Sequence, residues 1–293
     1  MSKLRVSILL IFAALQISCS SMLYHPSQHI YYDPKKLGIS PQEVNFKSSD
    51  GTKLHGWYFA NKKLKAKALI VFYHGNAQNI SSHYLALIPL LEFGYDFFIF
   101  DYHGYGKSEG KPSPAATVAD GEAALLWAHK NYPNLPIVIF AQSLGSVIAL
   151  KNSIDLKEKV PLRFIIIDSG FTSYQSIARK VLARSWITWP FQWLSYITLS
   201  DRYAPGEDIA KISPIPLLVI HGSNDAIIPF SAGEKLFSLA KEPKTFWKID
   251  DGRHTDALSR KNIQLDLIAC LNLYFDPPGQ KPSHSSTLPI CPK

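Results

Sequence analysis

The sequence predicts an α/β domain built on a mostly parallel sheet with helices on both faces, and three observations support this class. Apolar runs rich in β-branched residues alternate with longer segments of helical periodicity, as in repeated β-α units. The length of 293 residues suits a single large α/β core. Hydrophobic residues make up 46% and charged residues 18% of the chain, which excludes a disordered protein.

The expected elements follow from this alternation. The first two strands flank Asp50 and Gly51, a hairpin turn signal, so we expect the sheet to open with an antiparallel pair. The later apolar runs are short and bounded by turn residues, as buried strands are. Strands are expected at residues 43–47, 54–59, 68–73, 97–101, 137–141, 164–168, 217–221 and 245–249. Helices are expected at residues 81–91, 118–130, 144–152, 232–240 and 256–274.

The N-terminal residues have the pattern of an export signal. Lys3 and Arg5 precede an apolar run at residues 6–17. This run has about 12 residues, fewer than the roughly 20 that a membrane-spanning helix needs. We therefore expect residues 1–18 to be a signal peptide.

Residues 15–19, Leu-Gln-Ile-Ser-Cys, resemble the lipobox of bacterial lipoproteins, although Gln16 stands where that family usually has Leu. The resemblance implies that Cys19 carries fatty acyl chains such as palmitate, which anchor a protein without a transmembrane helix. Ser20 follows the Cys, and by the same resemblance a residue other than Asp favours the outer membrane, facing the periplasm of a bacterial envelope. Ordinary secretion and an uncleaved segment are the alternatives. Residues 19–42 are expected to be a tether.

The charge and cysteine content exclude several classes of protein. The net charge is +8, but the basic residues are scattered and no RNA-binding signature appears, so no nucleic-acid partner is expected. Three cysteines are too few for a disulfide-built scaffold, and no metal-binding spacing is present, so no metal or other cofactor is expected. Cys270 and Cys291 either pair in the oxidising periplasm or stay free. Residues 276–293 are rich in Pro and Ser and are expected to form a disordered tail.

A candidate nucleophile stands at the end of an apolar strand. Ala141-Gln142-Ser143-Leu144-Gly145 follows this strand and precedes a helix rich in small residues. A serine at such a strand-turn-helix apex needs small residues two places to either side, because larger side chains would clash between strand and helix. Gly145 meets this need, and Ala141 departs from the usual Gly by one methyl group.

Two further residues complete a catalytic pattern. Asp225 lies in a loop just after the strand at 217–221, and His254 lies in a loop between the strand at 245–249 and the last helix. The chain order is Ser, Asp, His, with each residue after a strand. This order is the one described for α/β-hydrolases.

The chain resembles the α/β-hydrolase superfamily over roughly residues 45–274, and more narrowly the bacterial lipoprotein-type serine hydrolases, through residues 24–27 and 32–38. Residues 73–77, Tyr-His-Gly-Asn-Ala, match the oxyanion loop of the family. Residues 101–108 match its D-x-R-G-x-G-x-S turn, with His103 in place of Arg. The resemblance implies an α/β-hydrolase fold with an eight-stranded sheet in a domain spanning 43–275. The loss of a permanent cation at His103 predicts a less rigid loop.

The roles of the residues follow from chemical need. A serine hydroxyl must pass its proton to a base, so His254 is the expected base and later the acid. Asp225 is expected to orient the imidazole and stabilise its charged form. The oxyanion needs donors already in position, which we assign to the backbone N–H groups of Asn76 and Leu144.

Neighbouring acids and histidines are expected to be structural. Asp250, Asp251 and Asp256 share the loop of His254 or begin its helix, where acids commonly cap helix N-termini. His74 and His221 end strands beside glycines and are expected to be turn and core residues.

A segment of about 48 residues separates the strands ending at 168 and beginning at 217, too long for a plain connection. We expect a helical cap at about 171–210. Its aromatic stretch contains Trp186, Trp189 and Trp193 and is broken by Pro190. One interpretation is a lid that buries these rings against the core, with the tryptophans at the substrate pocket. The other is a membrane-facing or acyl-binding surface.

These observations predict a serine hydrolase of the carboxylesterase or lipase type. The substrate would be a small-molecule or lipid ester, or a thioester, with an apolar acyl part, cleaved through an acyl-enzyme. The alternatives are a prolyl-oligopeptidase-like peptidase and a non-catalytic hydrolase scaffold that binds lipids or a partner. The sequence leaves the oligomeric state open.

Overall fold

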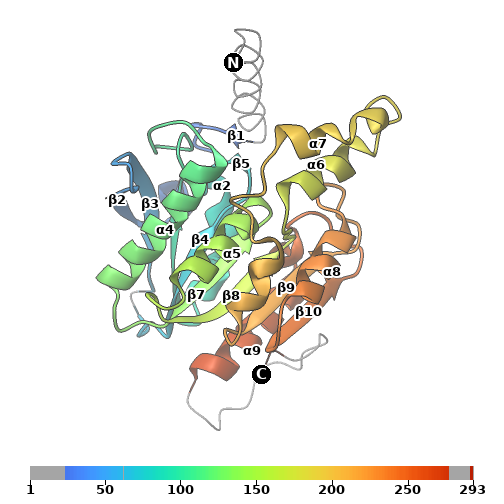
Figure 1. Ribbon diagram of the computed structural model, residues 1–293. Coiled ribbons are helices and arrows are strands. Elements are labelled where there is room, and N and C mark those ends of the chain that lie inside the picture. Colours follow the sequence, from blue (N-terminus) through green and yellow to red (C-terminus); the bar gives the residue numbers. More distant parts are fainter. Residues whose placement is uncertain (1–23, 62, 277–290, 293) are drawn as a thin grey trace.

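The computed structural model describes residues 24–61, 63–276 and 291–292 (Figure 1). The expected signal peptide, the candidate lipid site Cys19 and most of the expected tail lie outside the described residues. Among the described helices, none is both long enough and apolar enough to cross a membrane.

The core of the molecule is an eight-stranded sheet in the order β10-β9-β8-β7-β4-β6-β3-β2. The strands from β10 to β6 run parallel, and β3 pairs antiparallel with both β6 and β2. The predicted fold class and the opening hairpin are therefore confirmed. The strand bounds are β2 Gln42–Lys47, β3 Lys53–Phe59, β4 Ala68–Tyr73, β6 Tyr95–Phe100, β7 Ile137–Gln142, β8 Leu162–Asp168, β9 Leu217–Gly222 and β10 Lys244–Ile249.

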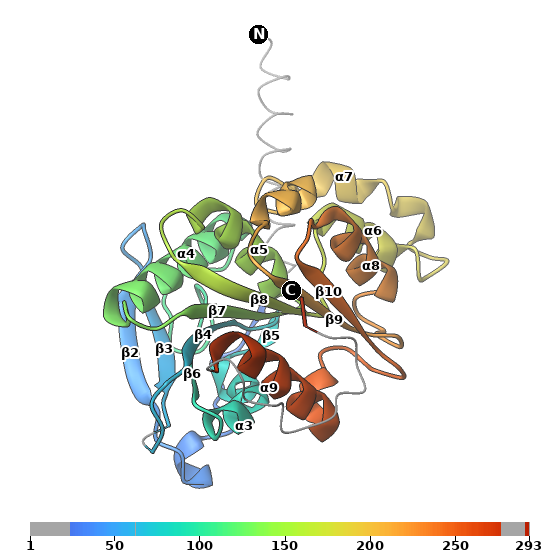
Figure 2. The same cartoon turned by 90° about the horizontal axis from the view of Figure 1, so that it is seen from below.

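Helices cover both faces of this sheet (Figure 2). The side chains of β4, β6 and β7 are buried on both faces, which explains their near-continuous apolar sequences. One apolar cluster lies under α4, α5 and α8, and the other lies under α2, α3 and α9. The helix bounds are α2 Ile80–His83, α3 Ile88–Leu91, α4 Pro114–Asn131, α5 Leu144–Leu156, α8 Phe230–Leu239 and α9 Lys261–Phe275.

All five predicted helices differ from the observed bounds, and the first and the last differ because 3-10 turns occupy part of the predicted range. The single helix expected at 81–91 is wrong: α2, a 3-10 turn at Tyr84–Ala86 and α3 take its place. Pro89 lacks the N–H that a continuous helix would use and instead lies in the first turn of α3. The last helix begins at Lys261, after a 3-10 turn at Ala257–Ser259, rather than at 256.

The chain before the sheet is packed against the domain. Tyr24 is buried, and its hydroxyl lies 3.3 Å from that of Thr117. The short strand β1 (His25–Pro26) pairs in parallel with β5 (Ala77–Gln78), a two-stranded sheet that the sequence did not predict. Within the range 19–42 that was expected to be a tether, the described residues from Tyr24 onward include these packed elements.

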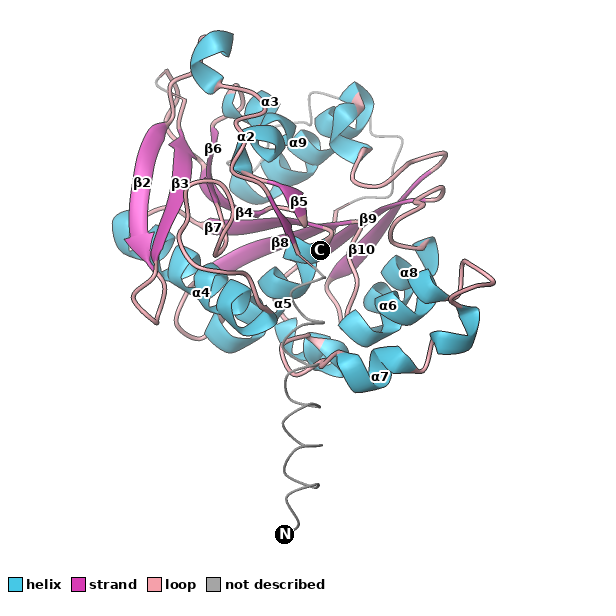
Figure 3. Ribbon diagram, turned by 90° about the horizontal axis from the view of Figure 1, so that it is seen from above, coloured by secondary structure: helices cyan, strands magenta, loops and turns pink. Residues whose placement is uncertain are grey.

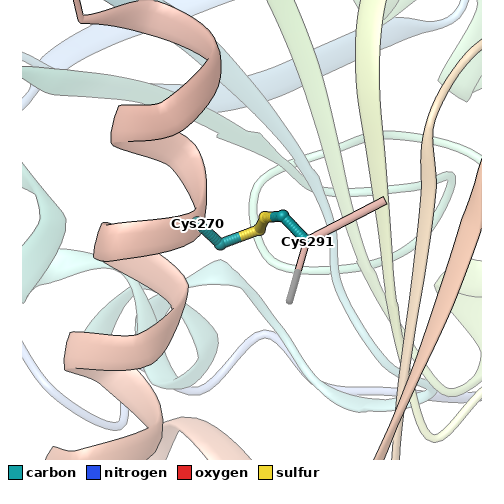
Figure 4. The surroundings of a disulfide bond; sticks show 2 residues. All are labelled: Cys270 and Cys291. Atoms are coloured by element: carbon teal, nitrogen blue, oxygen red, sulfur yellow. A yellow bond between two sulfur atoms is a disulfide. The ribbon is translucent and has the colours of Figure 1, made fainter. Parts of the chain in front are cut away.

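Near its C-terminal end the chain is tied to the last helix. Cys291 is buried and forms a disulfide with Cys270 of α9, with their Cα atoms 5.3 Å apart (Figure 4). Of the two alternatives for these cysteines, the structure has the paired one. The composition argument for a tail did not anticipate this attachment, and residues 277–290 lie outside the described part of the chain.

A helical segment between β8 and β9 forms the cap. It contains α6 (Tyr174–Leu182), a 3-10 turn at Trp189–Phe191 and α7 (Leu194–Thr198). The two helices lie side by side at one end of the molecule (Figure 3). Figure 1 shows that β1 and β5 lie at the same end and that α9 lies at the opposite end.

Candidate active site

Ser143 occupies a strained turn between β7 and α5. Its backbone angles are φ 51° and ψ −117°, a conformation that non-glycine residues rarely adopt. Its N–H donates a 3.0 Å hydrogen bond to the carbonyl of Asp168 at the end of β8. The local sequence therefore forms the predicted strand-turn-helix with the serine at its apex.

Gly145 allows the helix after Ser143 to approach the loop after β4. A Cβ atom at this position would overlap the carbonyl oxygens of Tyr73 and His74. The other flanking position, Ala141, is fully buried in β7 and is accommodated between its neighbouring strands. The close approach brings the predicted oxyanion loop beside the serine turn.

Asp225 and His254 are joined directly. The Asp225 Oδ2 atom accepts a 2.8 Å hydrogen bond from His254 Nδ1. Asp225 Oδ1 accepts from the N–H groups of Ile227 and Ile228, both at 2.8 Å. These bonds hold the carboxylate and fix the imidazole with Nδ1 toward it, which leaves Nε2 as the free ring nitrogen.

The same bonds set the charge of Asp225. Burial alone raises its pKa, but hydrogen bonds from His221 and His254, the charge on His254 and the N–H of Ile228 together lower the pKa well below its usual value. Asp225 is therefore ionised at neutral pH.

His221 is a functional neighbour that the sequence interpretation placed only in the core. It is fully buried, and its Nε2 lies 3.1 Å from the carbonyl of Ile228 and 3.5 Å from Asp225 Oδ2. Its ring packs against Gly233 of α8, where a Cβ atom would overlap it. His221 and His254 thus both lie beside Asp225 Oδ2. The only signal in the sequence was its position four residues before the acid.

Asp168 is a second buried carboxyl group close to the site. Burial raises its pKa to about 6, against the opposing effects of a 3.0 Å hydrogen bond from Gln142 and of the nearby His254. Asp225, with its lowered pKa, is therefore the better permanent anionic partner for His254.

Ser169 links β8 to the loop that carries His254. It adopts a positive φ of 56°, and its Oγ accepts a 3.1 Å hydrogen bond from the N–H of Thr255. No periodicity or motif in the sequence marks this residue.

The three other acids near His254 bind groups other than its imidazole. Asp250 pairs with Lys248, and Asp251 accepts from the Asn224 side chain. Asp256 accepts from the N–H of Arg253 and from the Arg260 side chain.

The loop after β4 carries Asn76 into the site. The hydroxyl of Tyr105 donates to the Asn76 carbonyl at 2.7 Å, and the N–H of His25 in β1 donates to Asn76 Oδ1 at 3.0 Å. Leu144 is the first residue of α5, so its N–H has no partner within the helix. Both Asn76 and Leu144 line the same cavity as Ser143. His74 is fully buried, with its Nδ1 2.7 Å from the Gly75 carbonyl.

The loop after β6 is held by His103. Its Nδ1 lies 2.7 Å from Asp120 Oδ1, its N–H donates to Asp120 Oδ2, and its Nε2 lies 3.3 Å from Asp50 Oδ2. The hydrogen bond with Asp120 raises the pKa of His103 despite partial burial. His103 thus takes the place of the arginine as the group that joins this loop to its surroundings, because its imidazole lies between two carboxylates.

A cavity of about 890 Å³ brings these groups together. Ser143 and His254 lie in its wall, and none of its described lining residues is Asp, Glu, Lys or Arg. Burial lowers the pKa of His83, another lining residue, so this imidazole is neutral near pH 7. The cap contributes a mainly aliphatic wall, formed by Ile177, Ala178, Val181, Leu182, Leu194, Ser195, Thr198 and Leu199.

The cap tryptophans are not part of this wall. Trp186, Trp189 and Trp193 are 86%, 62% and 56% exposed, and the cavity is lined by other cap residues. The prediction that they form the substrate pocket is wrong, and so is the lid that buries their rings. The inward positions of the cap belong to smaller aliphatic side chains.

Within the described residues, no group of three or more His, Cys, Asp or Glu side chains is arranged to hold a metal ion. The cavity wall contains both Ser143 and His254, and the His254 imidazole is hydrogen-bonded to Asp225, which is not itself a lining residue.

A family model described as serine aminopeptidase, S33, matches residues 64–213, about half of the chain. The chain belongs to this α/β-hydrolase family. The protein YfhR of Escherichia coli K12 is 38% identical over 248 residues, which cover 83% of this chain and 82% of that protein. The lysophosphatidylserine lipase ABHD12 of Macaca fascicularis is 31% identical over 198 residues, 65% of this chain and 49% of the lipase.

Solved structures of similar fold include an esterase of Pyrococcus furiosus, Pf2001. It has a TM-score of 0.67 and 20% sequence identity, and the match covers 86% of this chain and 98% of the esterase. At this identity the likeness concerns the fold of this α/β-hydrolase.

Proposed function

We propose that this α/β-hydrolase cleaves a carboxylic ester or thioester with an apolar acyl part, through Ser143, His254 and Asp225. One observation carries the proposal: a single cavity contains the strained serine, the imidazole bonded to an ionised carboxylate, and an aliphatic wall from the cap. Each of these groups meets a separate need of acyl transfer.

In the proposed reaction His254 Nε2 takes the hydroxyl proton of Ser143 as its Oγ attacks the carbonyl carbon. The N–H groups of Asn76 and Leu144 stabilise the oxyanion, and Asp225 stabilises the imidazolium. The imidazolium then returns its proton to the leaving alcohol or thiol, which leaves an acyl-enzyme. A water molecule, activated by the same imidazole, releases the acid and restores Ser143.

The cavity wall supports an apolar acyl group. Aliphatic residues of α6 and α7 form one side, and His25, Gln78 and His83 form a more polar side that suits an uncharged or polar leaving group. The similarity to a lysophosphatidylserine lipase is consistent with an ester of this amphiphilic kind.

The family description names an aminopeptidase, and such an enzyme binds the N-terminal ammonium group of its substrate. The described wall has no carboxylate side chain for that purpose, which favours esters over peptides with a free N-terminus.

The proposed location is the bacterial cell envelope. Cys19 would carry the lipid anchor, and the domain would lie on the periplasmic side of the outer membrane. The disulfide between Cys270 and Cys291 supports an oxidising compartment. Replacing Cys19 is expected to release active protein from the membrane fraction. A Cys19→Ala protein that stays as firmly with the outer membrane as the wild type after a high-salt wash would refute the anchor.

Labelling with a fluorophosphonate probe tests the nucleophile without assuming a substrate. We expect an adduct on Ser143, located by peptide mass spectrometry, and its loss in Ser143→Ala. The variant should keep the free energy of unfolding within about 1 kcal/mol, because the hydroxyl adds little to the core. Ser195→Ala is the matched control, since this hydroxyl also lines the cavity. A folded protein without an adduct would favour a non-catalytic scaffold.

Acyl-chain preference tests the substrate class. Activity should rise as the acyl chain of a soluble ester grows from about two to about eight carbons, because each buried methylene adds about 0.8 kcal/mol of binding. A steady fall over this series would contradict the apolar acyl pocket.

A further inference from the structure

The cap exposes an apolar surface that the proposed reaction does not use. It is formed by consecutive turns of one segment, between the C-terminal end of α6 and α7, and its most exposed side chain is Trp186 at 86%. Soluble proteins rarely expose several large apolar side chains of one segment together without a binding role. We call it the outer cap face: Trp186, Ile187, Trp189, Phe191, Trp193 and Tyr196.

The outer cap face points away from the cavity. The same segment lines the cavity with Leu194, Ser195 and Thr198, whereas Trp193 and Tyr196 between them are more than half exposed. The segment is therefore amphipathic, with an aliphatic side toward the substrate and an aromatic side toward the surroundings. A surface of this kind needs a partner other than the substrate in the cavity.

The charge beside this face is positive. The guanidinium of Arg179 lies 5.8 Å from the ring centre of Tyr196 and donates to its hydroxyl, and Arg184 donates to the carbonyls of Ala226 and Ile227. Lys180 donates to the Ser231 hydroxyl. None of these three cations forms an ion pair with a carboxylate in the described part of the chain, so their charge is not neutralised.

Residues 174–198 of the cap contain no Asp or Glu, and the next carboxylate along the chain is used internally. Asp201 accepts hydrogen bonds from the Ser173 hydroxyl and the N–H of Gln175 at the start of α6. Aromatic side chains next to unneutralised cations match the headgroup region of an anionic bilayer, where Trp and Tyr rings partition and Arg and Lys meet lipid phosphates. A second copy of the same face would bring like charges together.

The N-terminal connection also leads to this end of the molecule. β1 lies at the same end as α6 and α7 (Figure 1), and His25 lines the cavity together with residues of both helices. Cys19 precedes Tyr24 by five residues, which span less than about 18 Å even when fully extended. A lipid at Cys19 would keep the cap end of the domain close to the membrane.

We propose that the outer cap face docks on an anionic lipid bilayer and turns the cavity toward it, so that the substrate is an amphiphilic ester taken from the membrane. The docking itself stands on the cap and its charges. Only the inference that the substrate is an amphiphilic ester from the membrane rests on the proposed function.

Quenching of tryptophan fluorescence by brominated lipid tests the docking. The full chain is bound to vesicles of phosphatidylethanolamine and phosphatidylglycerol that contain a brominated phosphatidylcholine. Trp57 and Trp247 are buried in the core and Trp127 is partly buried, so contact quenching reports on the three cap tryptophans. We expect strong quenching in the wild type and in Ser143→Ala, which keeps the face but loses the nucleophile.

The variant Trp186→Ser/Trp189→Ser/Trp193→Ser should lose the quenchable fluorescence. Its activity on an ester embedded in these vesicles should fall at least about tenfold. Its activity on a short soluble ester should be unchanged. Arg179→Gln should weaken vesicle binding roughly fivefold, and added salt should reduce this difference. Leu273→Ser, an exposed apolar position on α9 at the opposite end, is the matched control and should change neither quantity.

Absence of quenching in vesicle-bound wild-type protein would overturn the proposal. Concentration-dependent dimers that disappear in the triple variant would also overturn it, because the face would then bind a second copy. Quenching in a protein that hydrolyses no ester would leave the docking standing and refute the proposed function.

Discussion

His103 stabilises the loop after β6 in a pH-dependent way. Its pKa is raised in the folded protein by Asp120 and Asp50, so the imidazolium contributes stability that is present below the unfolded pKa of about 6.5 and is lost as pH rises through the folded pKa. We expect His103→Ala to cost roughly 1–3 kcal/mol at pH 5.5 and clearly less at pH 9. Urea denaturation at the two pH values measures this difference.

His103→Arg is the matched control, because arginine keeps its charge across this range. It should retain the stability at both pH values. An alanine variant with the same loss at pH 5.5 and pH 9 would show that packing, and not charge, accounts for the effect of His103.

His221 is expected to act as a positioning residue for Asp225. Replacing it with Leu removes a hydrogen bond to the buried carboxylate, so the imidazole of His254 loses part of its support. We expect kcat on a soluble ester to fall roughly tenfold with KM unchanged, since the change affects the transition state and not substrate binding.

His221→Gln offers a donor again and should recover part of kcat. Equal kcat values for the wild type and His221→Leu would mean that Ile227 and Ile228 hold Asp225 without help from His221.

At the scale of residues, the sequence predicted those site residues that directly follow the ends of strands. Ser143, Asp225 and His254 are recognisable because small residues, chain order and strand positions coincide. His221, Asp168 and Ser169 were not recognised as parts of the site, because their roles depend on contacts between loops far apart in the chain. No local pattern encodes such contacts.

At the scale of elements, α6 and α7 supply the aliphatic wall of the cavity, which is the proposed acyl pocket. Ile177 of α6 lines the aliphatic part of the cavity, so Ile177→Trp should fill it. We expect kcat/KM for a long-chain soluble ester to fall at least about tenfold while that for a short-chain ester stays nearly unchanged.

Ile187→Trp is the control for this change, because Ile187 is 61% exposed on the outer cap face. Parallel losses on both esters for Ile177→Trp would indicate a disturbed active site and not a shortened pocket.

The sheet was predictable as a set of elements and the cap was not. The strands are apolar runs of ordinary length with turn residues at their ends, and their observed bounds differ from the predicted ones by a few residues. In the cap, the aromatic stretch contains Pro190 and has no regular period, so the sequence did not show which side chains face the cavity. The packing of α6 and α7 against the core decides which side chains of the cap face the cavity.

At the scale of the whole molecule, the disulfide closes the C-terminal part of the chain. Cys270 and Cys291 are 21 residues apart, and closing a loop of that length stabilises the folded state by about 3 kcal/mol in the chain-entropy model. We expect Cys270→Ala/Cys291→Ala to lose about this amount of unfolding free energy. Activity on a soluble ester should be retained, since α9 lies opposite the cap.

A reducing agent should destabilise the wild type by a similar amount and leave the double variant unaffected, as measured by urea denaturation. Equal sensitivity of both proteins to the reductant would mean that the bond contributes nothing to stability. The pairing itself was left open by the sequence, because spacing alone does not show whether two cysteines meet.

The short strand β1 has a practical consequence for where the domain can be cut. A fragment that starts at the first strand of the large sheet would lack His25, and with it a wall residue of the cavity and the N–H that holds the Asn76 side chain. Such a fragment would keep all three residues of the proposed triad, and we expect it to be an impaired catalyst. Expression boundaries and fusion junctions therefore belong upstream of Tyr24.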